Sequence, residues 1–309
     1  MATVGELLVE ASRRWTDAGR HGSGLETPRL DAEVLLAHVL GVGRTGVLAH
    51  PDAPVGDGSA STFRTLMDRR VAGEPVAYLR GIQEFHGLAF SVDGRVLIPR
   101  PETEQLVDLG YDRVRAILTG APRPPGAPEI RVWDVATGSG AVAVALAALL
   151  RKRGYLEEVR LIASDVSPDA LAVAVENAVA HGVADRVELV RGDLLDIPDR
   201  ARVDLLLANL PYVPTAVVPT LPVEVRAEPM LALDGGPDGM DLIRRLMTGL
   251  PEVLLPGGRA LLEMGADQAD RMTATVGDLL PDLWTVDIHP DLAGRPRIAE
   301  VTQPDRSAR

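Results

Sequence analysis

Between residues 130 and 263, short apolar runs alternate with helix-like segments, and this order restricts the chain to few folds. It predicts a mostly parallel sheet with helices on both faces, in which ligands bind beyond the carboxyl ends of the strands. Two later runs, 283–288 and 297–302, predict an antiparallel hairpin that closes the sheet. The predicted strands are 130–133, 161–163, 187–190, 203–208 and 259–263, and the predicted helices are 141–153, 168–181 and 240–250.

The preceding segment has a different pattern. Up to residue 81, apolar residues recur at helical spacing, and they predict a small all-helical domain. Short extended runs broken by Gly87 and Gly94 then predict a linking β-hairpin over 82–98. We therefore expect three parts: a helical domain at 1–81 that recognises the substrate, the hairpin, and the sheet domain at 99–309. The apolar residues that carry the helical pattern are Leu7, Leu8, Ala11, Leu30, Val34, Leu35, Val39, Phe63, Leu66 and Met67.

Charge and composition narrow the classes of function. The net charge is −12, which weighs against direct nucleic-acid binding, because such binding is driven by Lys and Arg. The chain has no cysteine, so disulfides, thiolate zinc sites and cysteine nucleophiles are excluded, and no metal site is expected. The longest apolar run, 141–150, is too short to span a bilayer, and no signal peptide is evident. We expect a soluble, cytoplasmic protein with no membrane partner.

A glycine-rich loop at 134–140 follows the first predicted strand and leads directly into a helix. Glycines let a backbone approach a ligand closely, and a helix N-terminus offers free N–H groups. Residues 138–143 also satisfy the looser dinucleotide pattern G-x-G-x-x-A. On its own, the loop fits a nucleotide site and a plain tight turn equally well. The candidate binding residues in it are Asp134, Ala136, Thr137, Gly138, Ser139 and Gly140.

Acidic residues also follow the next two predicted strands. Asp165 ends the second, where its carboxylate can accept hydrogen bonds from both hydroxyls of a ribose. The competing interpretation is a helix N-cap, a role that Ser167 can fill instead. Asp193 ends the third strand, where it can meet an adenine amino group while Leu194 lies against the ring.

The fourth predicted strand ends in Asn209-Leu210-Pro211-Tyr212. The Asn209 side-chain oxygen and the Leu210 carbonyl can each accept one hydrogen bond from a planar NH2 group, and the Tyr212 ring can cover its flat face. By itself the tetrapeptide fits a turn as well, with Pro211 fixing φ. These four residues are the candidate catalytic residues, and Asn209 is also a candidate donor contact.

Polar residues at four successive strand ends resemble the site of the class I S-adenosylmethionine-dependent methyltransferases. The resemblance implies a Rossmann-like, mostly parallel seven-stranded sheet with an antiparallel last strand. It also implies S-adenosyl-L-methionine as cofactor: the glycine loop lies against its methionine part, Asp165 holds the ribose and Asp193 the adenine. Asn209 to Tyr212 then falls where that family places its N-methylating loop.

Further motifs are similar to the HemK-type protein-(glutamine-N5) methyltransferases, which modify peptide-chain release factors. The similarity runs from about Gly73 to Thr302, and the helices before it match that family's N-terminal domain in kind. It implies a release factor as partner, and we expect a monomer. By analogy, Arg100, Pro101 and Glu102 lie near the donor. The motifs are at 74–81, 85–88, 96–104, 232–239 and 255–258.

Three residues depart from that family's pattern: Leu210 replaces a proline, Ala136 replaces a glycine, and Pro296 stands where an acid is usual. Leu210 keeps the main-chain carbonyl and loses only the φ restriction of proline, at a cost of about 1 kcal/mol or less. Ala136 is tolerable if its φ is negative. The departures leave methyl transfer intact and leave the exact acceptor open.

Other functions remain to be weighed. A related methyltransferase could act on a small-molecule or another protein amide or amine, and an adenine N6-methyltransferase for RNA or DNA shares a similar Asn-Leu-Pro-Tyr loop. A nicotinamide-dependent dehydrogenase is suggested only by G-x-G-x-x-A, and Asp165 lies 25 residues past Gly140 rather than about 20. A non-catalytic binding module is the last alternative.

Overall fold

The computed structural model describes residues 1–17, 27–120, 128–198 and 202–304, and parts of the predicted helical and sheet domains lie outside these ranges. It contains a seven-stranded sheet in the order β5-β4-β3-β6-β7-β9-β8. β9 is antiparallel to both of its neighbours, and the other pairs are parallel. The predicted sheet with an antiparallel last strand is therefore confirmed. The strands are β3 (Ile130–Val135), β4 (Val159–Asp165), β5 (Val187–Arg191), β6 (Val203–Ala208), β7 (Leu254–Glu263), β8 (Thr285–Pro290) and β9 (Pro296–Thr302).

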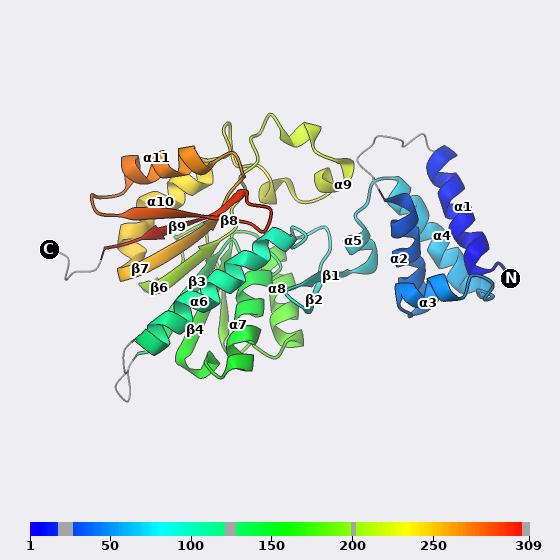
Figure 1. The fold of residues 1–309 in the computed structure, drawn as a ribbon, viewed down its shortest axis with the longest axis horizontal. Coiled ribbons are helices and arrows are strands. Elements are labelled where there is room, and N and C mark those ends of the chain that lie inside the picture. Colours follow the sequence, from blue (N-terminus) through cyan, green and yellow to red (C-terminus); the bar gives the residue numbers. More distant parts are fainter. Residues whose placement is uncertain (18–26, 121–127, 199–201, 305–309) are drawn as a thin grey trace.

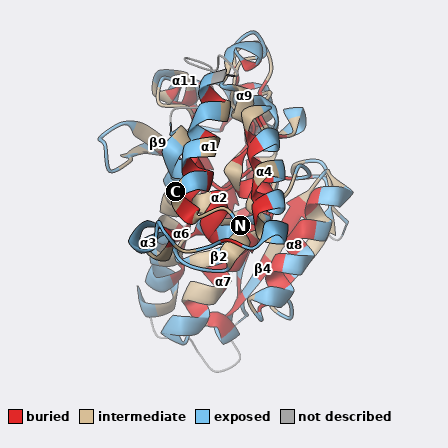
Figure 2. Ribbon diagram, turned by 90° about the vertical axis from the view of Figure 1, so that its right-hand side faces the viewer, coloured by how far each residue is buried: buried red, intermediate tan, exposed pale blue. Residues whose placement is uncertain are grey.

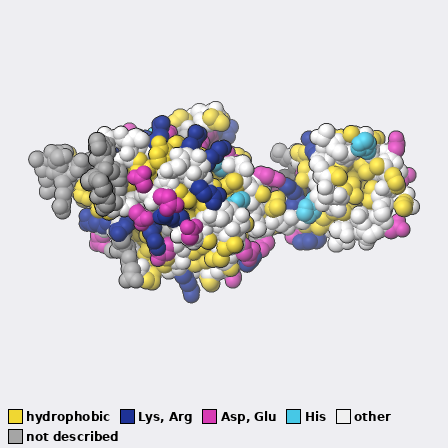
Figure 3. Space-filling model, turned by 90° about the horizontal axis from the view of Figure 1, so that it is seen from below, with side chains coloured by type: hydrophobic (Ala, Val, Ile, Leu, Met, Phe, Trp, Pro, Cys, Tyr) yellow, Lys and Arg dark blue, Asp and Glu magenta, His cyan; other side chains and the backbone are white. Residues whose placement is uncertain are grey.

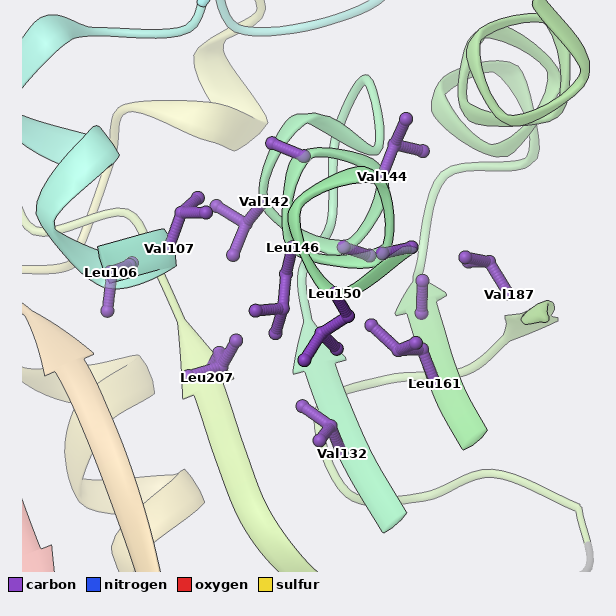
Figure 4. Close-up of a cluster of buried hydrophobic side chains, with 14 of the residues drawn as sticks. Leu106, Val107, Val132, Val142, Val144, Leu146, Leu150, Leu161, Val187 and Leu207 are labelled. Atoms are coloured by element: carbon purple, nitrogen blue, oxygen red, sulfur yellow. The ribbon is translucent and has the colours of Figure 1, made fainter. Parts of the chain in front are cut away.

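Helices cover both faces of the sheet (Figure 1). Because side chains alternate across a strand, Val132 and Leu207 face α6 and α7, whereas Trp133 and Leu206 face the layer formed by α10 and α11. Figure 4 shows the first layer, in which Leu146 of α7 packs over the strands. The helices are α6 (Glu104–Gly120), α7 (Ala141–Arg153), α8 (Pro168–Ala180), α10 (Asp241–Val253) and α11 (Ala269–Leu279), with a short α9 at Val223–Arg226.

The N-terminal helices form a separate lobe with its own core (Figures 1 and 3). Their buried faces turn toward one another, as Figure 2 shows for α1, α2 and α4. The predicted apolar positions are mostly buried, but Leu30 is 38% exposed, so it does not belong to the core. The helices are α1 (Val4–Asp17), α2 (Pro28–Leu40), α3 (Arg44–Ala49), α4 (Asp57–Val71) and α5 (Val76–Arg80).

A two-stranded hairpin, β1 (Ile82–Phe85) and β2 (Leu88–Ser91), connects the lobe to the sheet. The rings of Phe85 and Phe90 are buried edge to face, with centroids 5.9 Å apart, and belong to the same hydrophobic core as α7. Asn177 of α8 fixes the hairpin, since its side chain accepts from the Ser91 N–H at 2.7 Å and donates to the Ser91 carbonyl. The hairpin is therefore packed onto the sheet domain.

The structure differs from the sequence expectations in three places. The hairpin predicted over 82–98 pairs only from Ile82 to Ser91, and residues 96–98 belong to no strand. β7 begins at Leu254, before the predicted 259, because the segment with Pro256 pairs with the start of β6. Helix α11 was not predicted at all.

Candidate active site

A cavity of about 330 Å³ lies at the carboxyl ends of β3, β4, β5 and β6. Its size is within the usual range for a small-molecule site. The glycine loop, both strand-end acids and the loop after β6 meet at this cavity, although they are far apart in sequence. The predicted residues that line it are Asp134, Ala136, Thr137, Gly138, Ser139, Asp165, Asp193, Leu194, Asn209, Leu210 and Pro211.

Five predicted residues do not line the cavity. Gly140 packs against α8, and the Tyr212 side chain points behind the loop toward Glu263. Pro101 and Glu102 are exposed, and Arg100 is paired with Glu228. The block that contains them instead contributes Val96, Leu97, Pro99 and Thr103, together with Arg95.

The glycine loop adopts left-handed backbone conformations. The φ angles are 58° at Ala136, 57° at Gly138 and 78° at Gly140. The condition under which Ala136 was expected to be tolerable, a negative φ, is therefore not met, and the alanine is strained there by about 1–2 kcal/mol. A Cβ at Gly138 would meet no atom within 4 Å, so a side chain there would project into the cavity.

Asp134 holds this loop from below. Its Oδ2 accepts from the Thr137 hydroxyl at 2.6 Å and from the Ala143 N–H at 3.2 Å. Burial raises the pKa of Asp134 to about 7, and these two hydrogen bonds oppose the rise. Much of its hydrogen-bonding capacity is thus used on the loop and on the first turn of α7.

Asp165 lies at the end of β4 and faces the cavity. Its Oδ2 accepts from the Gly138 N–H and its Oδ1 from the Ser167 N–H, both at 2.9 Å. Burial raises its pKa. Ser167 is the N-cap of α8 and accepts from the Ala170 N–H, so Asp165 is not needed as the cap. A carboxylate has about four lone-pair positions, so Asp165 can still accept from a ligand hydroxyl.

Asp193 forms an ion pair that the sequence did not indicate. Its Oδ2 accepts from Arg245 of α10 at 2.8 Å, and both side chains are about half exposed. Arg245 also lines the cavity. Leu194 has a φ of 53° and lies beside the pair in the cavity wall.

The loop after β6 is fixed by its neighbours. Asn209 Nδ2 donates to the Thr103 hydroxyl at 3.1 Å, while Leu210 is 2% exposed and Tyr212 donates its hydroxyl to Glu263 Oε1 at 3.4 Å. Burial, followed by the charge of Glu263, raises the pKa of Tyr212 to about 12. The Asn209 amide is thus held through its nitrogen, with its oxygen left for the cavity.

The motif at 232–239 braces this loop from outside. A Cβ on Gly235 would lie 2.6 Å from the Pro211 carbonyl oxygen, and one on Gly239 would lie 2.2 Å from the Tyr212 carbonyl oxygen. Gln268 is 1% exposed and donates to the Tyr212 carbonyl at 3.1 Å. Only glycine permits so close an approach of two backbones.

Glu228 connects two segments that line the cavity. Buried Glu228 accepts from the Ile98 N–H at 2.9 Å and is paired with Arg100. Burial raises the pKa of Glu228, and the charge of Arg100 opposes the rise. This joins the 96–104 block to the segment whose Pro229, Leu231 and Ala232 line the cavity.

Sequence reasoning missed five supporting residues: Thr103, Glu228, Arg245, Glu263 and Gln268. Glu263 offered a signal, because it ends a predicted strand as the other acids do. Thr103 lay within the 96–104 motif, although its own role was not predicted, and Glu228, Arg245 and Gln268 gave no signal.

The residues present fit S-adenosyl-L-methionine. Asp165 presents carboxylate lone pairs of the kind that bind a ribose, Gly138 leaves open space beside the backbone, and Leu194 supplies apolar surface for a ring. Within the described parts of the chain, no group of three or more His, Asp or Glu side chains is arranged to hold a metal ion. No helix among the described residues is long and apolar enough to cross a membrane.

Comparison with known proteins identifies both parts of the chain. Residues 6–81 match the PrmC N-terminal domain, and residues 132–226 match a methyltransferase domain. The release factor glutamine methyltransferase of Moorella thermoacetica is 41% identical, with 96% of each chain covered. That of Deinococcus radiodurans is 36% identical, with 94% of this chain and 95% of the relative covered.

A solved structure supports the fold. The catalytic domain of hMettl16, crystallised with an RNA hairpin, superposes with a TM-score of 0.53 at 14% identity, covering 80% of each chain. The relatives match the chain over nearly its whole length, and the sheet order and the strand-end residues agree with a class I methyltransferase. The chain therefore belongs to the release factor glutamine methyltransferase family.

Proposed function

We propose that this protein transfers a methyl group from S-adenosylmethionine to the side-chain amide nitrogen of a glutamine in a peptide-chain release factor. The observation that carries the proposal is the orientation of Asn209, whose amide nitrogen is bound to Thr103 while the residue lines the cavity. Its oxygen is then available to accept from an acceptor NH2. The relatives named for this activity support the choice of acceptor.

In the proposed donor site, Asp165 accepts from the ribose hydroxyls and Asp193 receives the adenine amino group, with Leu194 against the ring. Asp193 must share its carboxylate with Arg245 or release it. The glycine loop, through Ala136, Thr137, Gly138 and Ser139, faces the methionine part. Asp134 and Gly140 hold the conformation of that loop. Arg100 pairs with Glu228 and so holds the segment whose Pro229 lines the cavity.

Bound S-adenosylmethionine supplies a methyl group on a positively charged sulfur. Asn209 Oδ1 and the Leu210 carbonyl hold the acceptor NH2 and turn the nitrogen lone pair toward that methyl group, while Pro211 confines the amide and Tyr212 holds the loop from behind through Glu263. An amide nitrogen is a weak nucleophile, so alignment at about 3–3.5 Å provides much of the rate. After methyl transfer, the acceptor nitrogen would give one proton to water.

We further propose that the parts act as 1–81 for substrate recognition, 82–98 as linker and 99–309 for methyl transfer. The lobe and the segment after the acceptor loop are in contact, because Arg70 binds Glu224 of α9 at 2.6 Å. A release factor held by the helices would thereby lie beside the loop that receives its glutamine. We propose that the protein works in the cytoplasm as a monomer.

The test is to incubate the purified chain with labelled S-adenosylmethionine and a release factor, and to locate the label by peptide mass. We expect label on one glutamine and none with Asn209→Ala, which should still bind the donor in equilibrium dialysis. Label on a small molecule or on RNA, with none on the release factor, would replace this acceptor by another. Binding of NAD in place of S-adenosylmethionine would refute methyl transfer.

A further inference from the structure

Glu263 is a buried carboxyl directly behind the acceptor loop. It ends β7 and is 1% exposed, and it does not line the cavity. Its Oε1 accepts from the Tyr212 hydroxyl, whereas its Oε2 is buried and lacks a well-formed hydrogen bond to any described residue. An under-satisfied buried carboxyl is costly, so it calls for a functional explanation.

Thr103 connects this carboxyl to Asn209. The Thr103 hydroxyl accepts from Asn209 Nδ2 and is close enough to Glu263 to stabilise its charged form. A hydroxyl has one hydrogen to donate. When Glu263 is a carboxylate it attracts that hydrogen, so Thr103 can only accept from Asn209, and the amide must present its NH2 to Thr103 and its oxygen to the cavity.

Protonation of Glu263 reverses the direction of these hydrogen bonds. It donates its own proton to the Thr103 oxygen, which frees the Thr103 hydrogen to point at Asn209. The Asn209 amide then turns over and presents NH2 to the acceptor NH2. Two donors facing each other cannot bond, so the acceptor loses its alignment.

We infer that Glu263 is a positioning residue for methyl transfer. Through the Thr103 hydroxyl it fixes Asn209 Oδ1 toward the acceptor nitrogen, and by accepting from the Tyr212 hydroxyl it holds Tyr212 in place. The inference rests on the proposed function for its acceptor. Glu263, at the end of β7, thus affects the reaction by setting which group donates in the hydrogen bond between Thr103 and Asn209.

The surroundings of Glu263 support a change of protonation near neutral pH. Burial raises its pKa to about 7, the Thr103 and Tyr212 hydroxyls and the positive charge of Arg297 oppose the rise, and the negative charge of Glu102 adds to it. Turnover should therefore increase as the pH rises through about 7, where the carboxylate forms.

The experiment measures kcat against pH, from about pH 5.5 to pH 9, for the wild-type chain and for Glu263→Gln. We expect Glu263→Gln to lose about 100-fold in kcat and the pH-dependent rise, while donor affinity is unchanged. Thr103→Val should show the same loss, and Thr103→Ser should restore activity. Unchanged kcat and pH profile in both Glu263→Gln and Thr103→Val would overturn the inference.

Glu300→Gln is the matched control. Glu300 is equally buried, on neighbouring β9, but it binds Arg113, Arg259 and His289 away from the loop. Its replacement should lower stability and leave kcat and the pH profile as they are. An equal loss in Glu300→Gln would reduce the Glu263 effect to one of stability.

A second readout does not depend on activity. The side-chain NH2 signal of Asn209, assigned by its loss in Asn209→Asp, should shift with a midpoint near pH 7 in the wild-type chain and stay fixed in Glu263→Gln. If the wild-type chain methylates no release factor, the proposed function fails, yet this titration still decides whether Glu263 controls Asn209. A signal that ignores pH in the wild-type chain overturns the inference.

Discussion

Replacing Ala136 by glycine should stabilise this protein. Ala136 is held at a φ of 58°, which costs a residue with a Cβ about 1–2 kcal/mol. Glycine loses about 0.4–1 kcal/mol through the greater freedom of the unfolded chain. Removing a half-buried methyl group costs about 0.4 kcal/mol more. The free energy of unfolding should therefore rise by about 0.5 kcal/mol.

The same substitution in an ordinary helix gives the control. Ala172 lies exposed within α8, and Ala172→Gly should lower the free energy of unfolding by about 1 kcal/mol. Urea denaturation of the full chain measures both variants, and the opposite signs separate backbone strain from the general cost of glycine. If Ala136→Gly destabilises the protein as much as Ala172→Gly does, the assignment of strain to this loop is wrong.

Three further outcomes follow from the same geometry. The pKa of Glu263 is about 7 against an ordinary 4.5, so its charge costs up to about 3 kcal/mol of stability above pH 7 and nothing below pH 4.5. Glu263→Gln should therefore unfold at higher urea than wild type at pH 8 and not at pH 4; an equal difference at both would contradict the buried charge. Asp165→Ala should raise the donor Kd about 10-fold to 100-fold in equilibrium dialysis, whereas exposed Asp185→Ala should not; equal affinities would remove Asp165 from the donor site. Gly239→Ala should lower turnover and the melting temperature, because its Cβ would lie 2.2 Å from the Tyr212 carbonyl oxygen, while exposed Gly94→Ala, with open space around it, should be neutral; similar behaviour of the two would refute the brace.

Local patterns predicted most of the sheet and the helices beside it. Strands such as β6 and helices such as α7 are strongly apolar and end in clear turn residues, so their bounds agree with the structure. Parallel topology then brings all their carboxyl ends to one edge, and Asp165 and Asn209 meet at the cavity for that reason. Helix α11 was missed although its buried residues Met272, Thr275 and Val276 recur at helical spacing.

The supporting contacts could not be predicted. Thr103 and Asn209 are 106 residues apart, and although both segments were expected near the donor, neither indicates that these two side chains bond. The hydrogen bond from the Ile98 N–H to Glu228 joins residues 130 positions apart, and it depends on how the segments around them come together in the fold. The positive φ of Ala136 was not predicted either, although the glycine that the family has at this position is typical of a left-handed conformation.

The ion pairs of Arg70 have a thermodynamic consequence. Arg70 is 3% exposed and bridges Asp31 of α2, at 2.8 Å, and Glu224 of α9, at 2.6 Å. If the lobe stabilises the segment around α9, that segment stabilises the lobe by the same free energy, since coupling between two sites is reciprocal. If an acceptor bound to the helices tightens donor binding, the donor must tighten acceptor binding by the same factor.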